Sequence, residues 1–68
     1  MTLSSKTKSV LSIGTKLKAA ESTYIITTMW TGANGKSLYL TIQDTKTHRT
    51  LYGEPASRLY GMEIVKEN

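Results

Sequence analysis

The chain contains no cysteine, few acidic residues and no long apolar run. Without cysteine it cannot have a disulfide framework, a thiolate nucleophile or a zinc site built from cysteine ligands. Because small secreted domains usually depend on disulfides, the composition favours a cytoplasmic protein. No apolar stretch approaches the roughly 18 residues that a membrane-spanning helix needs, and V-L-S-I before Gly14 is too short for the core of a signal peptide. We therefore expect a soluble protein without a membrane partner.

The scarce acidic and histidine side chains form no recognisable reactive centre. The five Asp and Glu residues are scattered singly, whereas Ca²⁺ loops and two-carboxylate centres need several acids close together. His48 is the only histidine, and Asp44 precedes it by four positions, but no Ser, Cys or Lys stands beside them in a nucleophile motif. Asp44 is better explained as a turn residue that caps its own backbone. We expect no catalytic residue, no metal and no cofactor, and hence no enzyme.

Basic residues are present in excess and are unevenly distributed. Nine Lys and Arg against five Asp and Glu give a net charge of +4. Four lysines precede the first acid, Glu21, and from there on five basic and five acidic residues cancel. Such an asymmetry favours an anionic partner, most often nucleic acid. An equally open interpretation is that a small protein carries net charge for solubility.

Sixty-eight residues allow one domain with one thin core. A domain of this size buries only about 60% of the surface of its unfolded chain, so we expect a stability of about 3–5 kcal/mol unless it oligomerises. Residues 1–9 are rich in Ser, Thr and Lys and have no usable period. They predict a flexible basic arm that contributes no core residue, followed by a single domain over residues 10–68.

Within that domain the sequence predicts short β-strands separated by turns. Residues 23–30 and 37–43 are rich in β-branched and aromatic residues, and Asn34-Gly35 lies between them. This dipeptide tolerates the positive φ of a tight hairpin. We expect strands over residues 15–19, 23–30, 37–43, 48–53 and 62–65, with one helical turn over residues 55–59.

The alternation of side chains assigns the faces of two of these strands. In the run over residues 37–43, Leu40 and Ile42 fall on one face and Tyr39 on the other, which predicts aliphatic side chains facing inward. Residues 23–30 carry apolar groups on both faces. That pattern indicates burial on both sides, or a β-bulge near Met29 and Trp30 that shifts the register.

Five short strands joined by tight hairpins bury their inner face well only when the sheet closes into a small barrel. The order of I-G-T-K-L-K at residues 13–18, Y-I-I at 24–26, S-L-Y-L-T-I at 37–42, the D-T-K-T hairpin and P-A-S-R-L resembles the SH3-like small barrels. The likeness is greatest to the KOW and Tudor-like group, and it covers about residues 13–65 as an architectural resemblance. It implies an all-β fold, a five-stranded barrel with a short helical turn before the last strand. Many barrels of this kind occur in nucleic-acid and chromatin proteins.

The aromatic residues are one Trp and four Tyr, with no Phe. Such side chains combine apolar area with a polar tip and suit wet interfaces and base stacking. We expect Tyr39 and Tyr52 to lie side by side on the outer face as a stacking platform, and Trp30 to be an exposed anchor. The alternative interpretations are that the tyrosines merely stabilise a sheet face and that Trp30 caps the core.

These observations predict a small nucleic-acid-binding module with little base specificity. The predicted binding residues are basic and aromatic: Lys6, Lys8, Lys16, Lys18, Lys36, Arg49, Tyr39, Tyr52 and Trp30. The alternative is a protein–protein interaction or assembly module that uses an exposed strand edge or associates with itself. The apolar groups on both faces of residues 23–30 favour this alternative.

Overall fold

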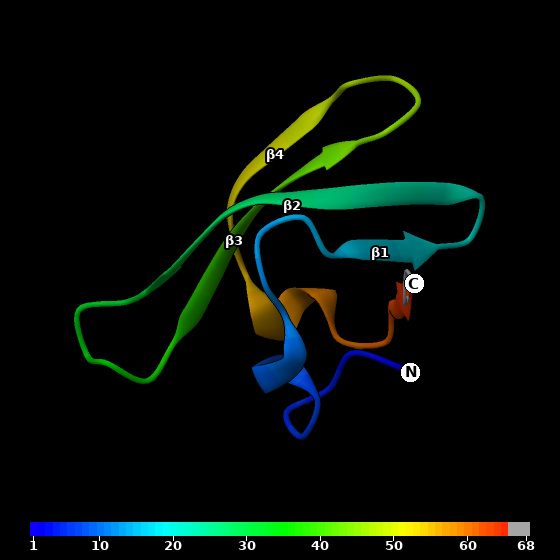
Figure 1. The fold of residues 1–68 in the computed structure, drawn as a ribbon. Helices are drawn as coiled ribbons and strands as arrows, with labels where there is room; N and C mark the ends of the chain where they lie inside the picture. Colours follow the sequence, from blue (N-terminus) through cyan, green and yellow to red (C-terminus); the bar gives the residue numbers. More distant parts are fainter. Residues whose placement is uncertain (66–68) are drawn as a thin grey trace.

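The computed structural model describes residues 1–65 and consists mainly of β-strands (Figure 1). The strands are β1 (Lys16–Ala19), β2 (Ser22–Thr31), β3 (Leu38–Asp44), β4 (Thr50–Pro55) and β5 (Glu63–Val65), and the 3-10 helices are η1 (Lys8–Val10) and η2 (Ala56–Leu59). Each expected strand and the expected helical turn are present, with bounds displaced by no more than two residues. Helix η1 was not predicted. Among residues 1–65, no helix is long and apolar enough to cross a membrane.

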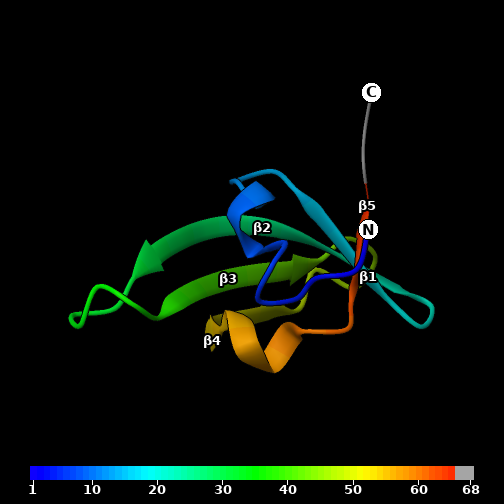
Figure 2. The same cartoon turned by 90° about the horizontal axis from the view of Figure 1, so that it is seen from below.

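The five strands form one antiparallel sheet in the order β4-β3-β2-β1-β5. The predicted all-β class is therefore confirmed. Over the described residues β4 and β5 do not pair with each other, so the sheet is not closed. Strands β2 and β3 are long and curved, and the loop between them projects from the rest of the molecule in both views (Figures 1 and 2).

A bulge in β2 resolves the ambiguous pattern of that strand. In the ladder Ile26 pairs with Ile42 and Thr28 pairs with Thr41. Thr27 is therefore an extra residue that has no opposite residue on β3. The bulge thus lies two residues before the predicted position. It reverses the inward face of the strand: Ile26 is buried before it and Met29 packs on the core after it. Consequently Trp30 points to the outer face.

The sheet curves around a core of aliphatic side chains. The buried members are Leu3, Leu11, Leu17, Ile26, Leu40, Ile42, Ala56, Leu59 and Ile64. Leu40 and Ile42 are fully buried, as the alternation in β3 predicts. Helix η2 contributes Ala56 and Leu59.

Leu3 corrects one expectation about the N-terminal residues. Its side chain is 1% exposed, its N–H donates to the Met62 carbonyl at 2.8 Å, and its carbonyl accepts from Gly61 N–H at 2.9 Å. A bridge between Thr2 and Glu63 places the segment beside β5 (Figure 1). The expectation that residues 1–9 contribute no core residue is therefore wrong. A single leucine among Ser, Thr and Lys has no periodic signal, so only tertiary packing reveals it.

The turn between β3 and β4 is built by Asp44, as predicted. Its Oδ1 accepts the backbone N–H groups of Lys46 at 2.7 Å and Thr47 at 3.0 Å. These two hydrogen bonds, that from Thr47 foremost, hold the pKa of Asp44 below its ordinary value. His48 was expected to begin the next strand but instead closes the turn with a φ of +64°. It is exposed.

Candidate functional site

A groove brings together residues that are far apart in the sequence. It has a volume of about 170 Å³ and is walled by η1, the start of β3 and the segment around η2. Lys8 enters it from η1 and Lys36 from the β2–β3 loop, together with Tyr39 on β3 and Tyr60 after η2. Three of the predicted binding residues, Lys8, Lys36 and Tyr39, thus line one groove.

The two groove lysines are not neutralised by acidic neighbours. Among residues 1–65 neither Lys8 nor Lys36 forms an ion pair with a carboxylate. Glu54, on the neighbouring β4, is instead 3.5 Å from the Arg58 guanidinium, one helical turn later in the chain. Both ammonium groups therefore remain available to an anionic ligand.

Trp30 and Tyr39 form an aromatic pair beside the groove. They are directly opposite across β2 and β3, with ring centroids 6.0 Å apart and planes inclined by 17°. The indole is 43% exposed, so Trp30 is exposed, as predicted, and does not cap the core. A stacked pair of this kind is worth about 0.5–1.5 kcal/mol beyond its area burial, which holds both rings in place.

A glycine makes room for the Tyr39 ring. A Cβ on Gly32 would lie 2.9 Å from Cε2 of Tyr39, closer than a side chain can approach. At Gly53 a Cβ would be in ordinary contact with the benzo ring of Trp30, at 3.7 Å, and the constraint there is a φ of +60°. The position of the Tyr39 ring therefore depends on the missing side chain of Gly32.

Tyr52 does not join this pair, which corrects the predicted tyrosine platform. Tyr39 pairs with Pro55, and a register shift between Leu40 and Ile42 places one extra residue of β4 in the ladder. Tyr52 consequently lies three residues along β4 from Pro55 and is 80% exposed. The aromatic partner of Tyr39 is Trp30 instead. Local alternation does not specify the bulge at Gly53, and the register depends on that bulge.

The other predicted basic residues lie outside the groove. Lys6 is exposed in the N-terminal segment, Lys16 and Lys18 lie on β1, and Arg49 is exposed after the β3–β4 turn. The nine predicted residues therefore do not all line this groove. Tyr60, which lines the groove, was missed, although its place after the predicted helical turn was a usable signal.

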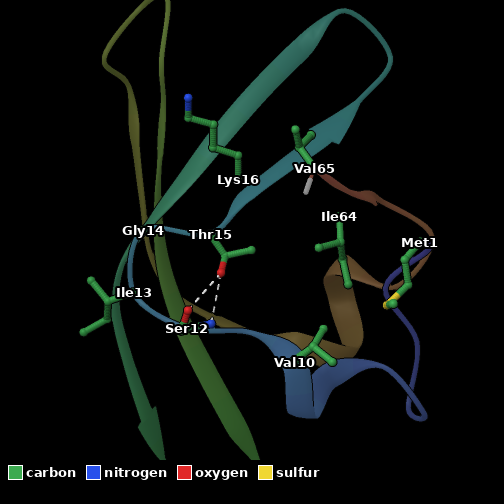
Figure 3. A pocket seen from close by; sticks show the side chains of 9 residues that line it. All are labelled: Met1, Val10, Ser12, Ile13, Gly14, Thr15, Lys16, Ile64 and Val65. Carbon is green, nitrogen blue, oxygen red and sulfur yellow. Dashed lines mark hydrogen bonds between the residues drawn. The ribbon is translucent and has the colours of Figure 1, made fainter. Parts of the chain in front are cut away.

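A second, more apolar hollow lies on another side of the molecule. It has a volume of about 510 Å³, and Figure 3 shows Met1, Val10, Ile13, Ile64 and Val65 around it. Met1, Val10 and Ile13 are exposed apolar side chains. A hydrogen bond of 3.1 Å from Ser12 N–H to Thr15 Oγ1 shapes one rim.

The groove offers two cations and aromatic rings, which are groups suited to binding an anionic ligand. His48 is exposed in a turn, and the Asp44 carboxylate accepts hydrogen bonds from backbone N–H groups. Among residues 1–65 no three His, Asp or Glu side chains gather to hold a metal ion. Comparison of the chain with protein-family models, with curated proteins and with solved structures found no match.

Proposed function

We propose that this protein binds nucleic acid through the groove between η1, β3 and η2. The observation that carries the proposal is the convergence of Lys8 and Lys36, which are far apart in the sequence, beside Tyr39 and the Trp30 ring. Two unpaired ammonium groups suit two phosphates, and exposed aromatic faces suit bases.

The same groove predicts weak base specificity. Selective base-edge readout is favoured by the planar, paired hydrogen-bonding groups of Arg, Asn and Gln. Of the charged residues, only lysines line the groove, and the lysine ammonium acts as a point charge on a flexible stem. Binding should therefore depend strongly on salt and little on sequence.

We also propose that the curved sheet is a variant of the SH3-like small barrel. The support is the bending of the sheet at two irregularities, Thr27 on β2 and Gly53 on β4, and the position of η2 between β4 and β5 in the chain. Bulges of this kind increase the local twist that closes small sheets.

Nucleic-acid binding is tested by fluorescence anisotropy with labelled oligonucleotides at low and moderate salt. We expect a Kd tighter than roughly 100 μM at low salt, because non-specific binders reach that range even at physiological salt. Lys36→Ala should weaken binding and reduce the slope of log K against log salt by about 0.9 on duplex DNA. Lys8→Ala should act in the same way.

The matched control is Lys46→Ala, which removes the same charge from the turn between β3 and β4. Lys46 does not line the groove. It should change the slope by much less than either groove variant. No binding at low salt would refute the proposal. Equal effects of Lys36→Ala and Lys46→Ala would show that the groove is not the site.

Assembly with a protein partner or with itself is the second candidate function. The favouring observation is the gathering of the exposed Val10 and Ile13 around the apolar hollow (Figure 3). The exposed edge of β4 is less suited to pairing with another strand, because Pro55 lacks an N–H and the Gly53 bulge interrupts this strand. Sedimentation velocity over a range of concentrations tests self-association, and Ile13→Lys should abolish any dimer that forms through the hollow.

A further inference from the structure

We infer that the groove and the aromatic pair beside it are built for single-stranded nucleic acid rather than for a duplex. This inference rests on the proposed nucleic-acid binding and specifies its ligand. In a duplex the base faces are stacked inside the helix, and only phosphates and base edges reach a protein. In an unpaired strand the faces are free to stack on aromatic side chains.

The aromatic rings are placed where stacking on a base is possible. Trp30 is 43% exposed and stacks on Tyr39, which lines the groove, and Tyr60, which also lines the groove, is 37% exposed. If the ligand were only a phosphate backbone, these rings would add little to the two lysines. Exposed aromatic faces next to unpaired cations therefore favour a ligand that offers bases and phosphates together.

The size of the groove points in the same direction. Its volume of about 170 Å³ is below the roughly 300 Å³ at which pockets for drug-sized molecules begin. A groove of this size accepts one flat group at a time. A base that is turned out of a flexible strand can enter it, whereas a stacked base pair cannot.

The aromatic pair is also formed in the absence of a ligand. Trp30 and Tyr39 are fixed as cross-strand neighbours in a hydrogen-bonded part of the sheet. Gly32, whose N–H donates to the Ser37 carbonyl at 2.7 Å, leaves the space that the Tyr39 ring occupies. Rings that are already ordered lose little conformational entropy on binding.

The test compares a 12-nucleotide single strand, as DNA and as RNA, with a duplex of the same sequence at low salt. Trp30 is the only tryptophan of the chain, so quenching of its emission reports stacking without a label, and anisotropy reports binding. We expect at least one single strand to bind about 10-fold or more tightly than the duplex and to quench the emission. Whether DNA or RNA binds more tightly then identifies the kind of strand.

Variants separate stacking from charge. Trp30→Leu should weaken single-strand binding by about 5-fold or more, since one stacked base contributes about 1–3 kcal/mol, and should leave duplex binding unchanged. Trp30→Phe keeps an aromatic face and should retain most of the affinity. Gly32→Ala removes no functional group but displaces the Tyr39 ring, so it should also weaken single-strand binding. Tyr52→Ala, on an exposed tyrosine outside the groove, is the matched control.

The outcomes distinguish this inference from the proposed function. If neither strand nor duplex binds, nucleic-acid binding itself is refuted. If the single strand and the duplex bind equally tightly, and Lys36→Ala weakens binding while Trp30→Leu does not, nucleic-acid binding is supported and the single-strand inference is overturned. If circular dichroism shows that Trp30→Leu does not fold, Tyr60→Ala removes another aromatic ring from the groove and serves as the test. An unchanged single-strand affinity in that variant overturns the inference.

Discussion

Substitution of Leu3 by alanine tests whether the N-terminal segment belongs to the folded core. The leucine side chain is 1% exposed and packs in the core cluster. Removing a fully buried leucine side chain costs about 2–5 kcal/mol, the loss of transfer free energy plus the cavity that is left. For a domain of this size the whole stability is about 3–5 kcal/mol. Leu3→Ala should therefore remove most of the free energy of unfolding.

The measurement is urea and thermal unfolding followed by circular dichroism and by Trp30 emission. A loss of 2 kcal/mol should lower the Tm by about 8 °C or more. Val10→Ala is the control in the same segment, because Val10 is exposed, and it should change the free energy of unfolding by less than about 0.5 kcal/mol. Deletion of residues 1–9 should be at least as damaging as Leu3→Ala. A Leu3→Ala variant as stable as the unmodified protein would mean that residues 1–9 are a flexible arm after all.

Three further predictions concern two turns and the bulge in β4. Ala20→Gly should raise the free energy of unfolding by about 0.5–1 kcal/mol in urea titrations. Ala20 has a φ of +54° at the first central position of the β1–β2 turn, a conformation that favours glycine. Glu21→Gly is the control and should not stabilise the protein. Gly53→Ala should lower the Tm and shift the Trp30 emission, since Gly53 combines a φ of +60° with contact to the indole. The folded-state pKa of Asp44 lies below its ordinary value of 3.8, so its carboxylate stabilises the fold above that pH, and the effect is lost as pH falls through the lowered pKa. Asp44→Asn keeps an Oδ1 acceptor and should flatten the fall in stability between neutral and acidic pH; an unchanged pH profile would contradict the role of the carboxylate.

Local patterns predicted the fold better than they predicted the candidate site. The alternation of Leu40 and Ile42 with Tyr39 is a property of one strand, and it correctly assigned the faces of β3. The apolar groups on both faces of β2 indicated a bulge, but alternation alone cannot say which residue is extra. That position is set by the pairing with β3, which is a tertiary contact.

The site depends on contacts that no local pattern encodes. Lys8 and Lys36 line one groove only because η1 and the start of β3 both border it. The sequence pattern did not predict η1. Tyr52 was placed beside Tyr39 by assuming a regular β4, and the Gly53 bulge breaks that assumption. Leu3 was missed because one leucine in a polar segment has no period to recognise.

The extra residue in β2 determines where the strand tolerates a change of length. Deleting Thr27 would place Thr28 directly after Ile26, still opposite Thr41, so the ladder would become regular and Met29 would still face the core. Deleting Met29 itself would instead shift the strand by one residue and bring Trp30 to the position that faces the core. Insertions in the projecting loop over residues 32–37 carry no such penalty, because the loop lies outside the ladder. Natural variation in length should therefore be tolerated in the β2–β3 loop and at residue 27, and excluded from the regular parts of β2.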